Sequence, residues 1–308
     1  TEIINDLIAS KGSSTFSAIT PMGRQHENDR EATAADLKWL ADPAEEPEPF
    51  GDGGTKMAWN TFNVVSIYPN GNPVMSDVNQ RWVGDCCACA VIASMAYLYP
   101  RFVKHIIKDN MDKTYTVTMY DPKGKQISVG VGGDYFIGNS GDLGALGGRN
   151  KEVTWATILE KAMIKWNQIY QGSSNVGGIG TEYVSAIFTG DGESVGFGAN
   201  ALIAEDLQRA VEVSLKQGRL VIGGFTRSGE QVDQNWQTTS GHAFTFILPD
   251  DNTHLFKMRN PWGGTTDGVM KVKDDGRIPP MIDLRICAPG AAKNYGVGPD
   301  LGGYIPNF

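Results

Sequence analysis

Apolar residues recur at helical spacing in several stretches of the chain. From Val153 to Tyr170 they fall three or four positions apart, which predicts a helix with one buried face. The run from Cys86 to Tyr99 is apolar almost throughout and predicts a helix, which Pro100 should end. A third helix is predicted from about Ala201 to Lys216, with Gly218 as its C-terminal cap.

Strand patterns fall in two places. The segments Thr114 to Tyr120 and Gln126 to Val131 alternate around the turn at residues 121–124, which predicts a hairpin. Strand patterns then dominate after residue 218, in the four runs Leu220 to Thr226, Ala243 to Leu248, His254 to Arg259 and Val269 to Val272. This order predicts an α+β fold, with a helical lobe at residues 59–195, a β-rich lobe at 196–308 and a cleft between them.

The first 58 residues differ from the rest. A short helical patch runs from Glu31 to Leu40, and a stretch rich in proline and glutamate follows at residues 42–50. Such a composition is typical of a linker or an extended arm that is exposed to proteolysis. We therefore expect an N-terminal arm at 1–58 and a globular core at 59–308.

Composition excludes some classes of partner. The 308 residues are 41% apolar and 20% charged, with a net charge of -8. Nucleic acids and anionic membranes require clustered lysine and arginine, so neither is an expected partner. The longest apolar run, Ala88 to Leu98, is too short to cross a bilayer, so no membrane insertion is expected.

The cysteines do not form a disulfide or zinc pattern. Three of the four, Cys86, Cys87 and Cys89, lie within one helical turn, and Cys287 is far away in sequence. We expect free thiols. The chain opens on Thr1 and carries no signal-peptide pattern, which leaves its compartment open.

Cys86 is the candidate nucleophile. It would occupy the N-terminus of a helix, where the helix dipole favours a thiolate, and Asp85 would cap that helix. A cysteine in an apolar helix is usually a core residue, but Gln80 lies six positions earlier and could donate its amide to an oxyanion. Cys87 and Cys89 lack a glutamine at this spacing and are predicted to be packing groups.

Two later segments complete a possible Cys-His-Asn set. His242 follows a glycine and precedes an apolar strand, so it is favoured as the base over His26, His105 and His254. Asn260 precedes a proline that holds it extended, and Trp262 could shield an Asn-His hydrogen bond from water. Taken alone, the segment Asn260 to Gly263 would simply be a turn.

These segments resemble the calpain-type, papain-like cysteine proteases. The motifs that carry the resemblance are Asp77-x-x-Gln80-x-x-x-Gly84-Asp85-Cys86, Gly241-His242-Ala243, Arg259-Asn260-Pro261-Trp262-Gly263 and the helix Trp155-x-x-x-Leu159-Glu160-Lys161-Ala162. The resemblance implies a two-lobed papain-like fold. It also implies an endopeptidase that hydrolyses polypeptides through a thioacyl-enzyme on Cys86, with His242, Asn260 and Gln80 in the roles described above.

The resemblance further implies calcium dependence in many members. Asp77 and Glu182 are similar to the family's calcium-binding carboxylates, with Asn70 and Asn72 as helpers, although two such acids are ordinarily solvated surface charges. A second calcium site near Asp267, Asp274 or Asp275 follows the family pattern less well. The pair Gly177 and Gly178 is similar to a substrate-binding segment.

The chain also departs from the family. Cys87 stands where a tryptophan usually follows the nucleophile, and the arm at 1–58 has no counterpart, so it could be a pro-segment-like extension or a target of self-cleavage. Two other functions stay open: acyl transfer to an amine, as in transglutaminase-like enzymes, and a catalytically inactive calpain-like binding module. Resemblance to one-module members implies a secreted or cell-surface bacterial protein.

Overall fold

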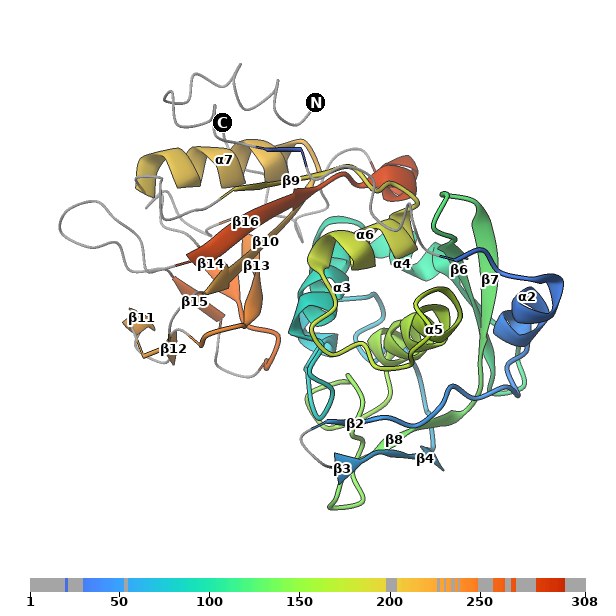
Figure 1. Ribbon diagram of the computed structural model, residues 1–308. Helices are drawn as coiled ribbons and strands as arrows, with labels where there is room; N and C mark the ends of the chain where they lie inside the picture. The colour runs from blue at the N-terminus through green and yellow to red at the C-terminus, as the bar shows by residue number, and fades with distance from the viewer. Residues whose placement is uncertain are drawn as a thin grey trace.

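The fold is that of a computed structural model of the chain. The structure describes residues 20–21, 30–52, 55–197, 204–225, 228–229, 231–233, 236–237, 239–248, 257–263, 267–269 and 281–296. Helices and strands are mixed along the chain, consistent with the α+β class. We call the seven-stranded sheet with its helix α7 the sheet part, and the helices α2 to α6 with their small sheets the helical part (Figure 1).

The sheet part is antiparallel throughout and has the order β1-β9-β16-β10-β13-β14-β15. Its strands are β1 (Thr20–Pro21), β9 (Ser194–Phe197), β10 (Leu220–Phe225), β13 (Ala243–Ile247), β14 (Lys257–Arg259), β15 (Asp267–Val269) and β16 (Met281–Cys287). Helix α7 (Ala204–Lys216) and helix α3 (Cys86–Leu98) both contact the central strand β10. The central strands β10 and β13 are almost entirely apolar and buried, as expected for strands covered on both faces.

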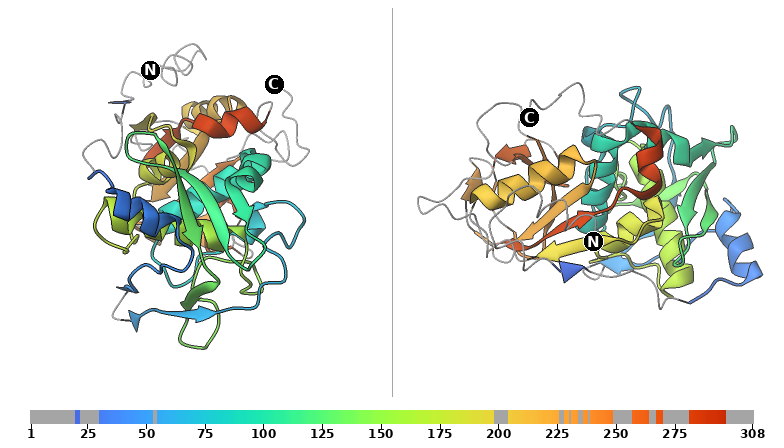
Figure 2. Two further views of the ribbon diagram at one scale, coloured as in Figure 1. Left: turned by 90° about the vertical axis from the view of Figure 1, so that its right-hand side faces the viewer. Right: turned by 90° about the horizontal axis from the view of Figure 1, so that it is seen from above.

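The helical part surrounds a single long helix, α5 (Trp155–Tyr170), as two views show (Figures 1 and 2). Around it lie α2 (Ala34–Ala41), α4 (Pro100–Ile106), α6 (Thr181–Thr189), the three-stranded sheet β5 (Ile107–Asp109), β6 (Tyr115–Tyr120) and β7 (Gln126–Val131), and the pair β4 (Ala58–Thr61) and β8 (Asp134–Ile137). Short elements complete the described chain: β2 (Gly51–Asp52), β3 (Thr55–Lys56), β11 (Gln231–Asp233), β12 (Trp236–Gln237) and the 3-10 turns η2 (Met75–Asp77) and η4 (Gly290–Tyr295).

Several predicted elements are confirmed with small shifts of their ends. The predicted helix 153–170 is α5, the hairpin is β6 and β7, and Gly218 adopts the left-handed conformation (φ 75°) after α7. The helix that begins at Cys86 does end before Pro100, but that proline starts a second helix at once. Among the described helices, no single one is long and apolar enough to span a membrane; α3 and α4 pass that test together, bent by 113°.

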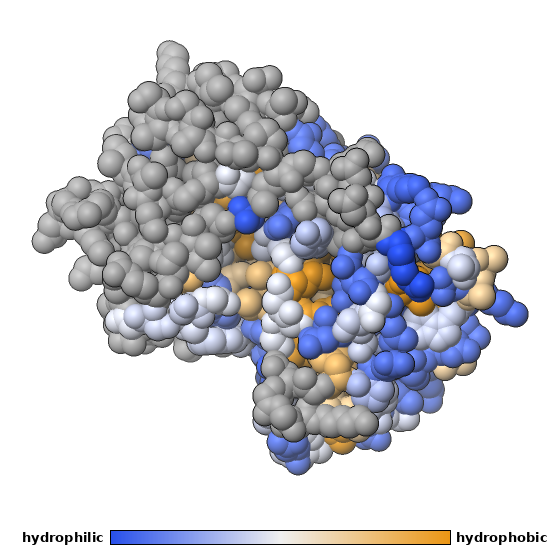
Figure 3. All heavy atoms as spheres, viewed as in Figure 1, coloured by the Kyte–Doolittle hydropathy of each residue, from blue (hydrophilic) through white to orange (hydrophobic). Residues whose placement is uncertain are grey.

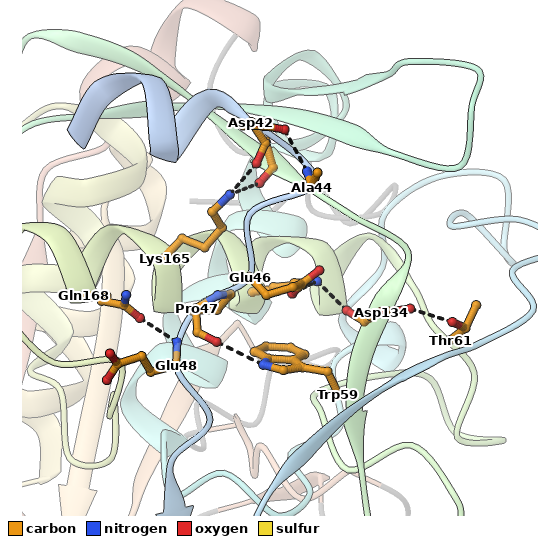
Figure 4. A network of polar contacts seen from close by, with 12 residues as sticks. Asp42, Ala44, Glu46, Pro47, Glu48, Trp59, Thr61, Asp134, Lys165 and Gln168 are labelled. Atoms are coloured by element: carbon orange, nitrogen blue, oxygen red, sulfur yellow. Dashed lines mark hydrogen bonds and ion pairs between the residues drawn. The ribbon is translucent and has the colours of Figure 1, made fainter. Parts of the chain in front are cut away.

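The described part of the N-terminal arm packs against the outside of the helical part. Lys165 of α5 donates a hydrogen bond to Asp42 O (2.9 Å; Figure 4) and another to Gly130 O (2.7 Å). Lys161 of the same helix forms an ion pair with Glu46 (2.6 Å). At Gly130 a Cβ atom would lie 2.5 Å from Ala41 O, so a glycine permits this close approach. Residues 30–50 are thus docked on the protein rather than extended from it.

Candidate active site

The sheet part and the helical part meet along α3, from Ala90 to Tyr97 as well as at its first residue. This helix contacts β10 and β13 on one side and α5 and α6 on the other (Figure 1). Its sequence is apolar on all sides, so burial between these layers is the favourable arrangement. Apolar residues are visible in the middle of the face drawn in Figure 3, between the two parts. The first residue of α3 is Cys86, which is only 8% exposed.

Strand register brings His242 and Asn260 together. In the antiparallel pair β13 and β14, Thr245 lies opposite Arg259. His242 immediately precedes β13 and Asn260 immediately follows β14, so both lie at the same end of the sheet. Nε2 of His242 is 2.7 Å from Oδ1 of Asn260, which makes Nε2 the protonated ring nitrogen because an amide oxygen can only accept. The other ring nitrogen can then accept a proton.

Asn260 is held from its own loop. Its Oδ1 also accepts a hydrogen bond from the backbone N–H of Trp262 (3.1 Å), and its side chain is fully buried. The indole of Trp262 lies over the His242 ring, with centroids 4.4 Å apart and planes inclined by 32°. The indole thus covers one face of the ring that hydrogen-bonds to Asn260, and Trp262 is itself 49% exposed.

Cys86 and His242 line one cavity of about 290 Å³. Sγ of Cys86 lies 3.7 Å from Gly241 O. The pKa of Cys86 is lowered to about 4, first by a hydrogen bond from the thiol of Cys87, then by His242 and the Ala243 amide, while burial opposes the shift. The Cys86 thiol is therefore suited to carry a negative charge at neutral pH.

Cys87 is more than a packing group. Its contact with Cys86 and its own burial raise its pKa well above the usual range, so its thiol stays protonated beside Cys86. It also lines the cavity together with Glu182 and Arg285, which form an ion pair (3.5 Å). The sequence singled out Cys87 only as a departure from a motif, and Arg285, on β16, carried no sequence signal.

Gln80 lies beside the asparagine turn. Its backbone N–H donates to Pro261 O (2.8 Å), and its side-chain Nε2 donates to Val83 O (2.9 Å). An amide nitrogen carries two hydrogens, so this bond leaves a second one for another acceptor. Gln80 is thereby linked to the loop that carries Asn260.

The prediction that Asp85 caps α3 is wrong. Asp85 is the residue before the first turn, but its side chain makes no capping hydrogen bond. The carboxylate is instead fully buried, where it accepts a hydrogen bond from Sγ of Cys89 (3.3 Å). The interior groups beneath the helix, rather than its own first N–H groups, determine the orientation of Asp85.

The residues implied for calcium do not form a ligand shell in this arrangement. Both carboxylate oxygens of Asp77 already accept hydrogen bonds, from Asn70 Nδ2 (2.7 Å) on Oδ1 and from Val74 N and Trp155 Nε1 on Oδ2. Glu182 is paired with Arg285, and Asn72 is exposed. Calcium takes six to eight oxygen ligands, which this set does not supply as it stands. Calcium dependence stays a prediction.

Of the other residues that the sequence singled out, some line the cavity and others lie away from it. Gly178 lines the cavity and donates its N–H to Gly84 O (3.0 Å), whereas Gly177 is bonded to Asn175 Oδ1. His105 stacks on Tyr295 and does not line the cavity. Cys287 is buried. All four cysteines are free, as predicted. His26, His254, Asp274, Asp275 and the side chain of Asp267 lie outside the described residues.

The family of the chain follows from a family model. The model of the calpain family cysteine proteases matches residues 59–268, about two thirds of the chain. This protein therefore belongs to the calpain family of cysteine proteases. A search among curated proteins finds no match.

Proposed function

We propose that this protein is a cysteine endopeptidase that hydrolyses peptide bonds in polypeptides through Cys86, His242 and Asn260. The observation that carries the proposal is that Cys86 and His242 line one cavity while Asn260 accepts a hydrogen bond from His242 at 2.7 Å. The membership of the calpain family supports the same class of reaction.

In the first half of the reaction, His242 holds the proton that the Cys86 thiol has given up. The Cys86 thiolate attacks the carbonyl carbon of the scissile bond. The developing oxyanion accepts hydrogen bonds from the backbone N–H of Cys86, at the N-terminus of α3, and from the amide of Gln80. The carbon-nitrogen bond then breaks as His242 gives its proton to the departing amine. A thioester between Cys86 and the acyl part of the substrate is left.

In the second half, His242 takes a proton from water, and the resulting hydroxide attacks the thioester. The carbon-sulfur bond breaks, the acid product leaves, and the thiolate-imidazolium pair is restored. Asn260 accepts from Nε2 of His242 in both protonation states of the ring, so it holds the ring orientation throughout.

Hydrolysis of unfolded casein by the intact chain and by Cys86→Ala tests this proposal, each with calcium and with a chelator. We expect cleavage by the intact chain and none by Cys86→Ala at unchanged thermal stability. Cleavage by Cys86→Ala would refute the assignment. Loss of cleavage with the chelator would support the calcium dependence that the family resemblance implies; cleavage indifferent to the chelator would exclude it.

An amine-incorporation assay on the same samples separates hydrolysis from acyl transfer. Incorporation of a labelled amine into casein without new chain ends would favour the transglutaminase-like alternative. Failure of a thiol-directed inhibitor to label Cys86 would favour the inactive binding module. Fragments of the protein itself that end within residues 1–58 would support self-cleavage of the arm.

A further inference from the structure

Two acidic side chains are buried together beneath Cys86. Asp85 and Glu160 are 0% and 1% exposed, and a carboxylate oxygen of each lies within 4.8 Å of the other and of Sγ of Cys89. No ion pair to either acid is present in the part of the chain that the structure describes. Two ionised carboxylates at this distance in a dry interior repel each other strongly, so at least one must be protonated.

Hydrogen bonds reach two of the four carboxylate oxygens and leave the other two without a donor. Oε1 of Glu160 accepts from the backbone N–H of Leu146 (3.1 Å), and Oδ1 of Asp85 accepts from Cys89 (3.3 Å). Oδ2 of Asp85 and Oε2 of Glu160 are buried and have no donor while both groups are ionised. One proton on Oε2 would satisfy both of these oxygens through a single O–H···O bond.

We propose that Glu160 is a positioning residue for Cys86: its protonated carboxyl group donates to Asp85 and so fixes the turn that presents the reactive thiol. Asp85 is the residue that immediately precedes Cys86 and therefore transmits any movement of its side chain to the first turn of α3. Glu160 belongs to α5, which is buried over nearly its whole length and gives a rigid anchor. The inference rests on the proposed role of Cys86.

The titration behaviour of the cluster agrees with this placement of the proton. Burial and the neighbouring Asp85 raise the pKa of Glu160 well above its usual range. Burial raises the pKa of Asp85 to about 6, against the hydrogen bond from Glu160 that lowers it. The titratable groups that face Asp85 are Cys86, Cys87 and Cys89 from α3 and Glu160 from α5.

A bound metal ion would be the other way to satisfy the two oxygens. Among the described residues such an ion would find three ligand groups, those of Asp85, Glu160 and Cys89, whereas a structural zinc site has four. A shared proton needs only the two carboxyl groups. The proton is therefore the occupant that the surroundings favour.

The test compares Glu160→Gln, Glu160→Met and, as a control in the N-terminal arm that contacts the opposite side of α5, Glu46→Gln. Glutamine keeps an N–H donor for Asp85 and an oxygen for Leu146 N, whereas methionine removes both. The primary readout is the rate at which iodoacetamide alkylates Cys86 near neutral pH, followed on the Cys86 peptide by mass spectrometry. This rate does not depend on whether the protein hydrolyses casein.

We expect Glu160→Gln and Glu46→Gln to stay within about threefold of the wild-type alkylation rate, and Glu160→Met to lose on the order of tenfold through misplacement of the thiol. The infrared spectrum of the wild type near neutral pH should contain the C=O band of a protonated carboxyl group, and Glu160→Gln should lack it.

Three results would overturn the proposal. The first is a folded Glu160→Gln variant whose Cys86 is alkylated about tenfold more slowly than in the wild type. The second is the absence of the protonated-carboxyl band from the infrared spectrum of the wild type. The third is stoichiometric metal in the purified protein. If Glu160→Met does not fold, Glu160→Gln and the infrared band still decide. A wild type that fails to cleave casein but gives these alkylation rates would refute hydrolysis and leave the positioning role intact.

Discussion

Cys87 gives the sharpest prediction about the reactivity of the site. Its thiol hydrogen bond is the largest influence that lowers the pKa of Cys86 to about 4, ahead of His242. Where the family motif usually has a bulky indole beside the nucleophile, this chain has a second hydrogen-bond donor. Replacing Cys87 by alanine removes the donor and leaves Cys86, His242 and Asn260 in place.

The size of the effect follows from the strength of a hydrogen bond to a charged group. Such a bond contributes about 1.5–3 kcal/mol, and each pKa unit corresponds to about 1.4 kcal/mol. Cys87→Ala should therefore raise the pKa of Cys86 by about one to two units, to about 5 to 6. The thiolate would still predominate at neutral pH because His242 and the helix N-terminus remain.

The pH dependence of Cys86 alkylation by iodoacetamide measures this pKa directly, since only the thiolate reacts. Cys87→Ser is the matched control because its hydroxyl can still donate to the thiolate, so its midpoint should stay near that of the wild type. His242→Ala should raise the midpoint as well. All variants are compared on the Cys86 peptide, so that reaction at the other thiols does not contribute.

Equal midpoints for Cys87→Ala and the wild type would refute the reasoning, since they would show that the Cys87 thiol does not stabilise the charge. A midpoint for Cys87→Ser as high as that for Cys87→Ala would locate the effect in packing around the sulfur rather than in hydrogen donation.

Two further predictions concern stability. Gly263 has a φ of 76°, and a Cβ atom there would lie 1.7 Å from Oδ1 of Asn79; Gly263→Ala should therefore lower the free energy of unfolding by about 2–4 kcal/mol in urea titrations. Gly71→Ala, at a similar φ but with nothing within 4 Å, should cost about 1 kcal/mol, and equal losses would contradict the steric argument. Burial lowers the pKa of Lys165 from 10.5 to about 8. Between these two pH values the unfolded chain binds more protons at this lysine than the folded protein does. The free energy of unfolding that depends on Lys165 therefore rises with pH across this window. Lys165→Met should remove this rise in the urea midpoint and the exposed Lys108→Met should keep it; an unchanged pH dependence in Lys165→Met would show that Lys165 is not the group responsible.

Much of the site could be predicted because each of its parts has a local signal. The apolar run after Cys86 predicted a helix, the glycine before His242 and the apolar strand after it favoured that histidine, and the proline after Asn260 predicted an extended backbone. The sequence pattern did not predict which group each side chain contacts in the folded protein. Asp85 has the residue type and the position of a helix cap, so a local rule assigned it to the helix N-terminus, but Glu160 and Cys89 hold it in the interior.

Two buried lysines illustrate the same limit in the fold. Lys161 and Lys165 lie in a helix whose apolar spacing predicted one buried face, and a lysine is ordinarily a solvated residue. They are buried because the N-terminal arm covers that side of α5 and supplies Glu46 and the Asp42 carbonyl as partners. The same contacts explain why the proline-rich stretch, which has the composition of a linker, is docked on the protein.

The sequence by itself determined the family and the main helices and strands, and it singled out Cys86, His242 and Asn260 as candidates, because periodicity and residue spacing are properties of the chain. The tertiary structure alone decided which charges are buried and what compensates them. It placed Glu160 beneath Asp85, Cys87 beside the Cys86 thiol and Arg285 against Glu182, three contacts between side chains whose energies depend on burial and distance. Neither quantity exists until the chain has folded.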